Sequence, residues 1–480
     1  MTATVAMEAA LLAGFASRRF HCVGVGGAGM SGLARLLMGM GGEVSGSDSS
    51  DGPVLRQLLA EGCDVWFGGR PERVAGADGY VIRSAAVPAA DAEVQECVRR
   101  GFTSLLYAEA VGRLSEGRRT LAIGGTHGKT TTTALTVAGL RAAGQDPSHL
   151  IGGDVPEFAP LPGGGGATSG GNGYGGRGQE FVVEACEFNR SFHSLRPFGA
   201  AILNVDHDHF DCYPSSEELI DAFAGYLGRI RPGGTALVDE SVPRGVLNSL
   251  RSDVTILTVG SGLWADIRAI EVRDEVGRFA FVPVLRGERL PRVRMQLPGR
   301  HNMQNALFAL GLAHVAGADP VAASRGLAGF GGVSRRFELH HGAAGGLLVN
   351  DYAHHPVEIQ ATLAAARRRF PDRRLLVAFQ PHQFQRTRFL LSEFAEALCK
   401  ADLTLVVDIY GARETDTERG SVSALDLVDA VRERGGRCGL GGSVAELPAR
   451  VLEHCGPRDV VLVLGAGDVD RAVGGIVAAI

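Results

Sequence analysis

The sequence predicts an α/β protein of three domains: a Rossmann-like N-terminal domain, a central domain built around a P-loop-type turn with a mostly parallel sheet, and a Rossmann-like C-terminal domain. Short runs rich in Val, Ile and Leu alternate with longer Ala- and Leu-rich helical stretches, which is typical of parallel α/β sheets. Two glycine-rich turns each stand between such a run and a helix. A chain of 480 residues also exceeds one ordinary hydrophobic core, which favours several domains.

Nine apolar runs are expected to form buried strands, because each is short and closed by glycine or polar residues. They are FHCVGV (20–25), GYVIRS (79–84), TLAIGG (120–125), EFVVEA (180–185), AAILNV (200–205), GGLLVN (345–350), RLLVAF (374–379), LTLVVDIY (403–410) and DVVLVLG (459–465). Polar or glycine-rich linkers near residues 116–119 and 331–334 interrupt the series. We therefore expect an N-terminal domain at 1–117, a central domain at 118–333 and a C-terminal domain at 334–480.

Composition and charge exclude several classes of protein. Hydrophobic residues make up 45% and charged residues 21%, which is typical of a globular chain rather than a disordered one. The formal charge of −5 argues against a general nucleic-acid or membrane surface, and no apolar stretch approaches the length of a membrane helix. The start of the chain is expected to be a short helix or loose tail, not a signal peptide. Eight scattered cysteines without a C-x-x-C pair fit a reduced cytoplasm and give no zinc signal.

The first glycine-rich turn has the pattern of a diphosphate site. In FHCVGVGGAGMSGLARLLMGMG a strand leads into Gly24-x-Gly26-x-x-Gly29 and then into an amphipathic helix. Small residues let the backbone approach a diphosphate, and the helix N-terminus offers N–H groups and partial positive charge. Asp48 follows 19 residues after Gly29, where a ribose-binding acid would stand. From this motif alone, an NAD or FAD site and a structural turn without a ligand both stay open.

The second turn, IGGTHGKTTTT at 123–133, has the form of a phosphate loop without its outer glycine. The usual pattern is G-x-x-x-x-G-K-[ST], and Ile123 stands at its first glycine. Backbone N–H groups would wrap the phosphates, Lys129 would reach the terminal phosphates, and the Thr130 hydroxyl would bind magnesium. A threonine-rich helix cap is the alternative, but it leaves the positive charge of Lys129 at the positive end of a helix, where the two repel. A bound anion beside Lys129 removes this repulsion, so we interpret the turn as a nucleotide site.

Acidic and polar side chains follow the next two predicted strands. Glu184 and Glu187 come after the first of them. The segment after the second carries Asn204, Asp206, His207, Asp208, His209 and Asp211. Parallel strands deliver their carboxyl ends to one sheet edge, where carboxylates and a histidine suit a second magnesium ion near the phosphate loop. A solvated acidic loop or helix cap is the alternative for each residue taken singly.

Two compositional stretches are interpreted without ligands. Residues 163–178, GGGGATSGGNGYGGRG, have almost no side chain to bury, so we expect a flexible surface loop; a phosphate cradle is the alternative. The run AARRRFPDRR at 365–374 is interpreted as a charged helix end and turn rather than a nucleic-acid patch. The segment VLVLGAGDVD near the C-terminus is expected to be a last strand and a glycine turn that need not bind anything.

Together these motifs resemble the Mur ligases of peptidoglycan synthesis. That family has a phosphate loop of the form G-T-x-G-K-[TS], an acidic strand end, an N-x-E-x-D-H-x-D segment and a P-G-x-H-N-x-x-N helix start. Within the family, the chain is most similar to the ligases that add L-alanine. The motifs that carry this likeness run in order from about residue 20 to the end: VGVGGAGMSG, SGSD, GTHGKTTTT, GVSRRFE, NDYAHHP and FQPHQFQRTR.

The resemblance implies roles for particular residues. The UDP-sugar site would comprise Gly26, Gly27, Ala28, Gly29, Asp48 and Ser84. The ATP site would comprise Gly125, Thr126, His127, Gly128, Lys129, Thr130, Thr131, His301, Asn302, Asn305, Arg336 and Asp351. The expected catalytic residues are Lys129, Glu184 and His209. Magnesium, with two ions expected, would be held by Thr130, Glu184 and His209. The carboxylate of the incoming amino acid would be received by His354 and Arg386.

The implied activity is ATP-dependent ligation in peptidoglycan precursor synthesis, which makes the central domain a P-loop-type ATPase domain. The lactyl carboxylate of UDP-N-acetylmuramate would be phosphorylated by ATP, and L-alanine would attack the acyl-phosphate. The resemblance implies small-molecule substrates, a cytoplasmic monomer or homodimer, no membrane insertion and no nucleic acid. Arg335 and Arg336 stand at the expected hinge before the C-terminal domain, where they would bridge two domains or remain solvated.

Departures from the family pattern keep the substrate open. Asp206 replaces the usual Glu, Asn350 stands where many members have Asp, and Gln383 replaces an amino-acid-binding Arg of some members. Glycine or L-serine therefore stay open beside L-alanine. A recycling ligase that takes a tripeptide, a nicotinamide-dependent dehydrogenase and a non-catalytic nucleotide-binding regulator are the alternative functions.

Overall fold

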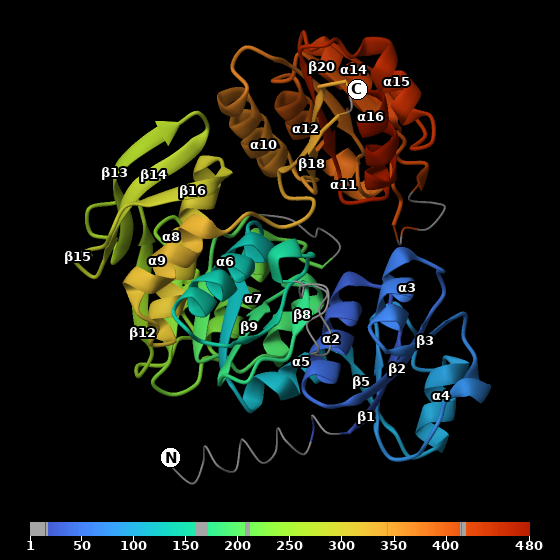
Figure 1. Ribbon diagram of the computed structural model, residues 1–480, viewed down its shortest axis with the longest axis vertical. Coiled ribbons are helices and arrows are strands. Elements are labelled where there is room, and N and C mark those ends of the chain that lie inside the picture. The colour runs from blue at the N-terminus through green and yellow to red at the C-terminus, as the bar shows by residue number, and fades with distance from the viewer. Residues whose placement is uncertain are drawn as a thin grey trace. The chain divides into compact units, whose positions relative to one another are not determined.

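Three sheets organise the chain in the computed structural model, which describes residues 15, 18–158, 171–206, 212–342, 344–412, 414 and 419–480 (Figure 1). The chain divides into two compact units. The first unit runs to Ile270 and includes Val282–Val293 and Gln304–Gly331; the second consists of Glu271–Phe281, Arg294–Met303 and Gly332–Ile480. Most of the strand pairs are parallel, which confirms the predicted α/β class.

The N-terminal sheet is a five-stranded parallel sheet in the order β3-β2-β1-β4-β5. Its strands are β1 (Arg19–Val23), β2 (Glu43–Asp48), β3 (Asp64–Phe67), β4 (Tyr80–Arg83) and β5 (Thr103–Leu106). Its helices are α2 (Ala28–Gly39), α3 (Pro53–Ala60), the 3-10 helix η1 (Pro71–Arg73), α4 (Ala92–Arg99) and α5 (Tyr107–Glu116). The strand order reverses between β1 and β4, and ligands of such sheets bind outside the carboxyl ends at that point.

A buried carboxylate ties α4 to the first three strands. Glu93 is 1% exposed, and its Oε1 accepts a hydrogen bond from Trp66 Nε1 at 3.0 Å. His21 Nε2 lies 3.4 Å from the same oxygen, and the Ser47 hydroxyl donates to Oε2. Burial opposes ionisation of Glu93, but the hydrogen bonds from His21 and Ser47 outweigh it and hold its pKa below the usual value. Each of β1, β2 and β3 thus supplies one partner.

The central sheet follows the order β15-β14-β13-β12-β11-β10-β6-β9-β7-β8, with β16 beside β14. Its strands are β6 (Arg119–Gly124), β7 (Ser148–Leu150), β8 (Gly173–Tyr174), β9 (Glu180–Glu184), β10 (Gly199–Ile202), β11 (Thr235–Asp239), β12 (Thr255–Gly260), β13 (Ile267–Glu275), β14 (Arg278–Leu285), β15 (Glu288–Arg289) and β16 (Val293–Pro298). Its helices are α6 (Lys129–Ala142), η2 (Pro156–Phe158), η3 (Phe188–Ser194), α7 (Ser216–Leu227), η4 (Arg244–Leu247), α8 (Arg300–Val315) and α9 (Pro320–Gly329). The parallel neighbours β9, β6 and β10 end at one edge, where their loops meet.

Residues 171–178 are packed, in contrast to the flexible surface loop expected for the glycine-rich stretch 163–178. The first part of that stretch, 163–170, lies outside the described residues. Residues 171–173 are buried, β8 pairs with β7, and the segment contacts α2 of the N-terminal sheet. A Cβ on Gly173 would lie 2.0 Å from the carbonyl oxygen of Gly32. Glycine is used here for close backbone approach rather than for freedom of motion.

Polar contacts complete this junction between the two sheets of the first unit. Asn172 Nδ2 donates to Ala28 O at 2.9 Å, and Arg35 Nη1 donates to Asn172 Oδ1 at 2.8 Å. Arg35 Nε also donates to Glu61 Oε2 at 2.7 Å, and Arg35 is only 3% exposed. The guanidinium therefore has hydrogen-bond partners from both sides of the junction.

The C-terminal sheet has six strands in the order β17-β18-β22-β19-β20-β21. They are β17 (Glu338–His341), β18 (Leu347–Asp351), β19 (Arg374–Phe379), β20 (Leu403–Val407), β21 (Cys438–Gly442) and β22 (Asp459–Leu464). Among the described strands of this sheet, only β17, beside β18, is antiparallel. Its helices are α10 (Pro356–Arg369), α11 (Phe384–Phe389), α12 (Leu391–Leu398), α14 (Ala424–Glu433), α15 (Leu447–His454), η5 (Val469–Ala472) and α16 (Val473–Ala479).

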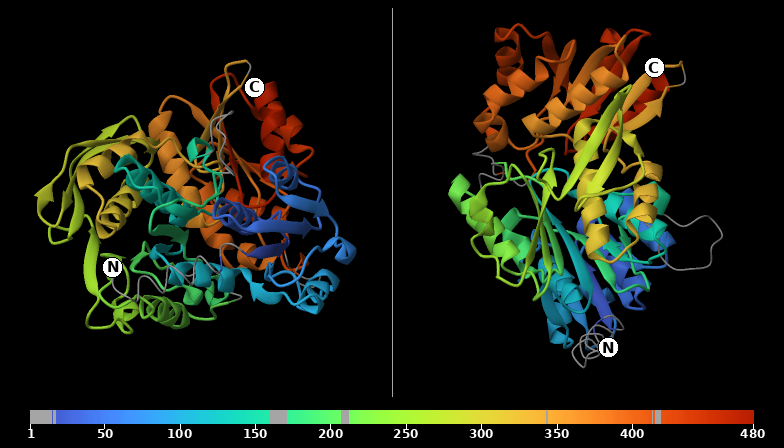
Figure 2. Two further views of the ribbon diagram at one scale, coloured as in Figure 1. Left: turned by 60° about the horizontal axis from the view of Figure 1, so that its bottom comes forward. Right: turned by 90° about the vertical axis from the view of Figure 1, so that its left-hand side faces the viewer.

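Helices cover both faces of the C-terminal sheet (Figure 2). Along β19, Leu375, Val377 and Phe379 join one hydrophobic cluster, and Leu376 and Ala378 join another. Both faces of the strand are therefore buried, which explains its unbroken apolar sequence.

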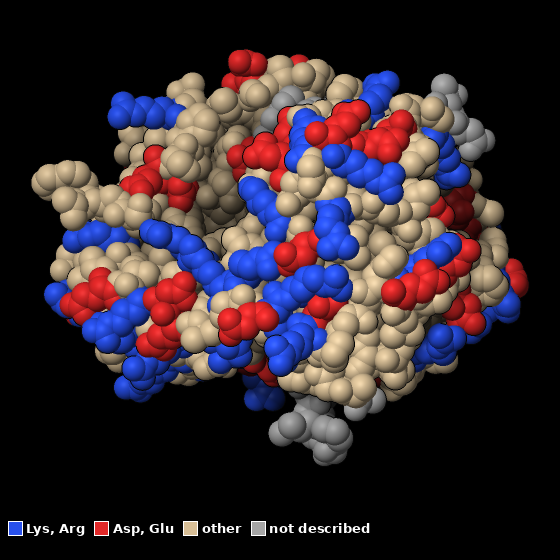
Figure 3. All heavy atoms as spheres, turned by 90° about the horizontal axis from the view of Figure 1, so that it is seen from above, with Lys and Arg blue, Asp and Glu red and all other residues tan. Residues whose placement is uncertain are grey.

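The arginine-rich run at 365–374 lies among acidic partners. Arg367 pairs with Asp402 at 2.8 Å, and Arg374 pairs with Asp459 at 2.5 Å. Figure 3 shows charges of both signs side by side on one face of the molecule. Within the part of the chain that the structure describes, no helix has both the length and the apolar character needed to span a bilayer.

Candidate functional site

The first glycine-rich turn lies where β1, β2 and β4 end. Gly24 has φ of +85° and donates from its N–H to Ser47 O at 2.8 Å. A Cβ on Gly24 would lie 3.1 Å from Ser84 Cβ, so β4 closes one side of the turn. Asp48 Oδ2 accepts a hydrogen bond from Gly26 N at 2.8 Å. The candidate UDP-sugar residues gather around the start of α2: Gly26, Gly27, Ala28, Gly29, Asp48 and Ser84.

The phosphate loop, residues 125–128, joins β6 to α6. Gly125 has φ of +135° and Gly128 has φ of +84°. Residues with a side chain adopt such positive φ values only with backbone strain. A Cβ on Gly128 would also lie 2.7 Å from Asn305 Oδ1. Glycine is therefore required at both ends of the loop, and the first N–H groups of α6 follow it directly. Such N–H groups, together with the positive end of the helix, bind phosphate.

The segment after β10 holds this loop in place. His127 N donates to Asn204 Oδ1 at 2.7 Å, and Asn204 Nδ2 donates to His127 O at 3.1 Å. The Thr126 hydroxyl donates to Asp206 O at 3.0 Å and accepts from Asp206 N at 2.9 Å. The Asn204 side chain and the Asp206 backbone thus hold the phosphate loop in place, and a metal role for the Asp206 carboxylate stays a prediction.

Lys129, the first residue of α6, has hydrogen-bond and ion-pair partners. Its Nζ donates to Gly125 O at 2.5 Å and to Thr126 O at 3.0 Å, and it lies 3.0 Å from both carboxylate oxygens of Glu187. Burial lowers the pKa of Lys129, but the charge of Glu187 outweighs burial and holds it above its usual value. Glu187, 2% exposed, thus supplies the anion that the sequence required beside this lysine.

Two of the three candidate magnesium ligands are described. Glu184 ends β9 and accepts a hydrogen bond from Gly152 N, while Thr130 is buried in the first turn of α6. Both offer oxygen atoms of the kind that Mg²⁺ prefers. His209 falls at 207–211, outside the described residues. Within the described ranges, no group of three His, Cys, Asp or Glu side chains could hold a metal ion, so the ligand set stays a prediction.

The three polar residues at the start of α8 differ in their surroundings. Asn305 is buried against Gly128 of the phosphate loop. Asn302 is also buried, and its Nδ2 donates to Pro298 O at 2.7 Å. His301 is exposed. The described contacts thus bring only Asn305 to the phosphate loop.

Asp351 and Arg336, both expected at the ATP site, lie near one another in the second unit. Asp351 ends β18, and its Oδ2 accepts hydrogen bonds from Phe337 N and Thr362 Oγ1, both at 3.1 Å. Burial raises the pKa of Asp351 to about 6, although the charge of Arg336 opposes this shift. The Arg336 guanidinium lies 5.0 Å from the centre of the Tyr352 ring.

The two candidate amino-acid ligands meet around a third residue that the sequence did not assign. The His354 ring lies 5.9 Å from the His382 ring, and Arg386 Nη1 lies 3.3 Å from His382 Nδ1. Arg386 is 5% exposed. Gln383, the N-cap residue directly before α11, has φ of +72°. His382 is therefore the centre of this group.

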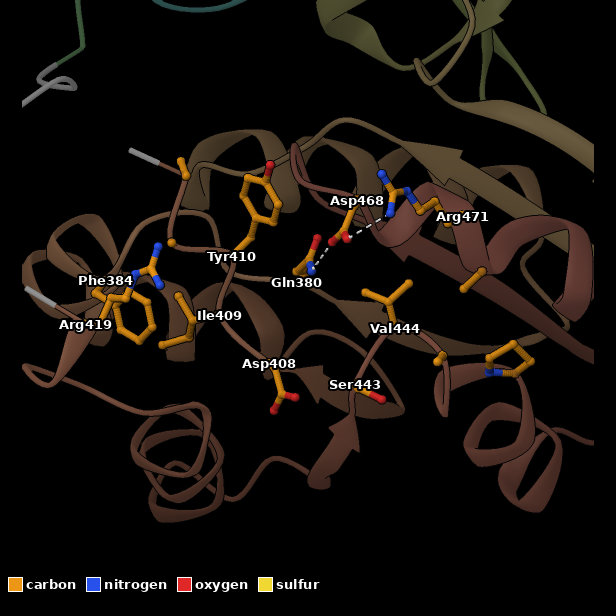
Figure 4. Close-up of a pocket in the computed structure, with 15 residues that line it drawn as sticks. Gln380, Phe384, Asp408, Ile409, Tyr410, Arg419, Ser443, Val444, Asp468 and Arg471 are labelled. Atoms are coloured by element: carbon orange, nitrogen blue, oxygen red, sulfur yellow. Dashed lines mark hydrogen bonds and ion pairs between the residues drawn. The ribbon is translucent and has the colours of Figure 1, made fainter. Parts of the chain in front are cut away.

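A hollow of about 750 Å³ lies at the carboxyl ends of β19, β20, β21 and β22 (Figure 4). Gln380 Nε2 donates to Asp468 Oδ1 at 2.9 Å, and Arg471 lies 3.8 Å from the same carboxylate. Tyr410 forms part of the wall, and its ring stacks on His382 with centroids 5.6 Å apart. This hollow was not predicted from the sequence. The signal was a polar residue directly after an apolar strand, as at Gln380 and Asp408.

Comparison with known proteins identifies the family. The profile described as the Mur ligase family, catalytic domain, matches residues 19–119; the Mur ligase middle domain matches 123–313; and the Mur ligase, glutamate ligase domain matches 335–467. A UDP-N-acetylmuramate–L-alanine ligase of Salinibacter ruber is 37% identical over 95% of this chain and 93% of its own length. The chain belongs to the Mur ligase family. A ligase of the same name from Nitratidesulfovibrio vulgaris is 39% identical over 94% of this Mur ligase and 96% of its own length.

Solved structures share the fold of this Mur ligase. The UDP-N-acetylmuramate-alanine ligase MurC of Thermotoga maritima superimposes with a TM-score of 0.78 at 23% identity, covering 96% of this chain and 98% of that chain. A murein peptide ligase of Psychrobacter arcticus gives a TM-score of 0.67 at 22% identity with the same coverage. The likeness confirms the three-domain α/β fold that the motifs predicted. Family membership also sets aside the nicotinamide-dependent dehydrogenase.

Proposed function

We propose that this Mur ligase joins L-alanine to the lactyl carboxylate of UDP-N-acetylmuramate, while ATP is converted to ADP and phosphate. The observation that carries the proposal is the identity of 37% and 39%, over nearly the whole chain, to ligases of that name from Salinibacter ruber and Nitratidesulfovibrio vulgaris. The glycine turn at the end of β1 is the proposed UDP site, and the loop before α6 is the proposed ATP site.

The residues at the second site fit a nucleotide triphosphate with magnesium. The left-handed Gly128 and the two hydrogen bonds between His127 and Asn204 give the loop its shape. When ATP binds, the Lys129 ammonium would leave the Glu187 carboxylate and bind the terminal phosphate instead. Thr130 and Glu184, together with His209, are the proposed magnesium ligands, and two ions are proposed for the family's chemistry. Bound there, Mg²⁺ would withdraw charge from the phosphoryl group.

The proposed reaction solves a leaving-group problem. A carboxylate cannot exchange its oxygen for an amine, because oxide is a very poor leaving group. The lactyl oxygen therefore attacks the γ-phosphorus, and the bond to ADP breaks. The amine nitrogen then attacks the acyl carbon, and phosphate leaves. Lys129 and the loop N–H groups would stabilise the charge on the transferred group. A base or a water molecule near His209 or His354 is our candidate acceptor for the amine proton.

Amino-acid selection is proposed for the group around His382. His354 and Arg386 would hold the carboxylate of the amino acid, and Gln383 stands where some relatives have a further arginine. The hollow beside Tyr410, at about 750 Å³, exceeds what the methyl group of alanine fills. A recycling ligase that adds a tripeptide to UDP-N-acetylmuramate is the second candidate function for the test.

Phosphate release by the purified chain tests both candidates. ATP, Mg²⁺ and UDP-N-acetylmuramate are supplied with L-alanine, glycine, L-serine or the L-Ala-D-Glu-diaminopimelate tripeptide, and mass spectrometry identifies the amide. Release with L-alanine and a product of matching mass supports the proposal. Release with the tripeptide alone moves the chain to the recycling ligase, and no release with any of them favours a non-catalytic regulator.

The cellular setting is also proposed. All eight cysteines are free thiols, as expected in a reducing compartment. We propose a cytoplasmic enzyme that works as a monomer or homodimer.

A further inference from the structure

Helix α5 is fixed between the two glycine-rich turns of the first unit. It follows β5 of the N-terminal sheet and packs on η3, which follows the carboxyl end of β9. A Cβ on Gly112 would lie 2.6 Å from Ser194 O, so the backbones are in close contact. Arg196 N also donates to Ser115 Oγ at 3.0 Å. The first residue of α5 is thereby held in a defined position.

That first residue, Tyr107, lies against the turn of the proposed UDP site. A Cβ on Gly29 would lie 3.1 Å from both Cζ and the hydroxyl oxygen of Tyr107. The phenol therefore occupies the space that a side chain at Gly29 would need. Among the described residues, the Tyr107 hydroxyl has no hydrogen-bond partner.

Tyr107 also lies within reach of the charge at the carboxyl end of β9. Burial raises the pKa of its phenol, and the nearby charge of Glu184 raises it further. The hydroxyl therefore stays protonated and remains a hydrogen-bond donor at neutral pH. A neutral donor at this place has a clear use, because a substrate carboxylate brought toward Glu184 would be repelled by it.

We propose that the Tyr107 hydroxyl donates a hydrogen bond to the lactyl carboxylate of the UDP-linked substrate and directs it from the Gly29 turn toward the phosphate loop. This inference rests on the proposed function. The lactyl group is the part of the substrate that must cross from the UDP site to the γ-phosphate. A donor between the turn and Glu184 would hold it on that path without adding charge.

The test is Tyr107→Phe, which keeps the ring against Gly29 and removes only the hydroxyl. Binding of UDP-N-acetylmuramate and of UDP-N-acetylglucosamine, which lacks the lactyl group, is measured by calorimetry without ATP. Loss of a hydrogen bond to a charged group is expected to weaken UDP-N-acetylmuramate binding by roughly 10- to 100-fold. Binding of UDP-N-acetylglucosamine and the melting temperature should not change. Tyr80→Phe, the same change at the amino end of β4, is the control and should affect neither ligand.

Each other outcome overturns a specific claim. Equal affinity of wild type and Tyr107→Phe for UDP-N-acetylmuramate overturns the role of the hydroxyl and leaves the proposed function standing. An equal loss for both sugars means that Tyr107 serves the turn and not the lactyl group. Failure of the wild type itself to bind UDP-N-acetylmuramate overturns the proposed function and this inference together.

Discussion

The ammonium group of Lys129 lies 3.0 Å from each carboxylate oxygen of Glu187, and the Glu187 side chain is 2% exposed. The pair lies at the N-terminus of α6, where a phosphate would bind. Glu187 therefore occupies, in electrostatic terms, the place of the nucleotide phosphates. Binding of ATP must transfer the lysine from one anion to another.

Replacing Glu187 by Gln should destabilise the protein most when no nucleotide is bound. Lys129 would lose its counter-charge, at a cost of about 3 kcal/mol in the free energy of unfolding, because one partner of a buried pair is removed. Saturating ATPγS should restore most of this loss, since its phosphates replace the carboxylate. Denaturation with urea, with and without ATPγS, measures the effect. The exposed Glu218→Gln is the control, and an equal loss in both conditions would contradict the exchange of anions.

Replacing Lys129 by Ala should abolish turnover while leaving the fold intact, because the charge that faces the transferred phosphate is lost. It should also strand the buried Glu187 carboxylate, so the variant should be less stable than wild type by about 3 kcal/mol. The double variant Lys129→Met with Glu187→Gln should regain stability but not activity. Near-normal turnover of Lys129→Ala would sink the assignment of the phosphate loop.

Replacing Gly128 by Ala should weaken ATP binding at least tenfold. The residue has φ of +84°, and the new Cβ would lie 2.7 Å from Asn305 Oδ1. Gly144 is a matched control, because its φ is +81° and nothing lies within 4 Å of its Cβ position. Both variants should lose roughly 1 kcal/mol from backbone strain, but only Gly128→Ala should lose affinity in a fluorescent-nucleotide titration. Equal affinities would show that the loop adapts to the methyl group.

Acidification should destabilise the chain through His149. This residue is fully buried between Phe158 and Tyr174, and burial lowers its pKa to about 3. The unfolded chain takes up a proton near the ordinary pKa of 6.5, so the stability present above that pH falls as the pH drops toward 3. The slope is about 1.4 kcal/mol per pH unit for this group.

The pH dependence can be isolated with His149→Leu. Unfolding free energies of wild type and variant should converge, or cross, between pH 6.5 and pH 4. The exposed His454→Leu serves as the control for loss of an imidazole and should leave the wild-type slope. A pH slope of His149→Leu equal to that of the wild type would show that the histidine is not the responsible group.

Strands buried on both faces were predictable from the sequence. All nine apolar runs form strands: β1, β4, β6, β9, β10, β18, β19, β20 and β22. Strands β13 to β16 at 267–298 were not predicted. Charged residues interrupt the apolar ones in β13, whereas β14 (RFAFVPVL) is a buried apolar run that was overlooked. In β13, for example, IRAIEVRDE places Arg268, Arg273 and Asp274 on a half-exposed surface. A search for continuous apolar runs finds only strands that are buried on both faces, and it misses strands with a solvent-exposed face.

The candidate site shows a similar division. The glycine positions were evident because a left-handed backbone and close contact leave few other choices, as at Gly24 and Gly128. The partners of Lys129 and the place of Tyr107 depend on residues far apart in the sequence. No local pattern states that Glu187 pairs with the lysine or that Gly29 meets a phenol. The roles assigned to individual site residues stay predictions.

The junction between α2 and residues 171–178 has a thermodynamic consequence. Separating the N-terminal and central sheets would leave Arg35, now 3% exposed, without one of its partners and would open a backbone contact that only glycine permits. Two sheets joined in this way are expected to melt in a single cooperative step. A ligand that binds at the β1 turn would then also stabilise the loop before α6 against unfolding. Binding at one site should therefore raise the melting temperature of the other.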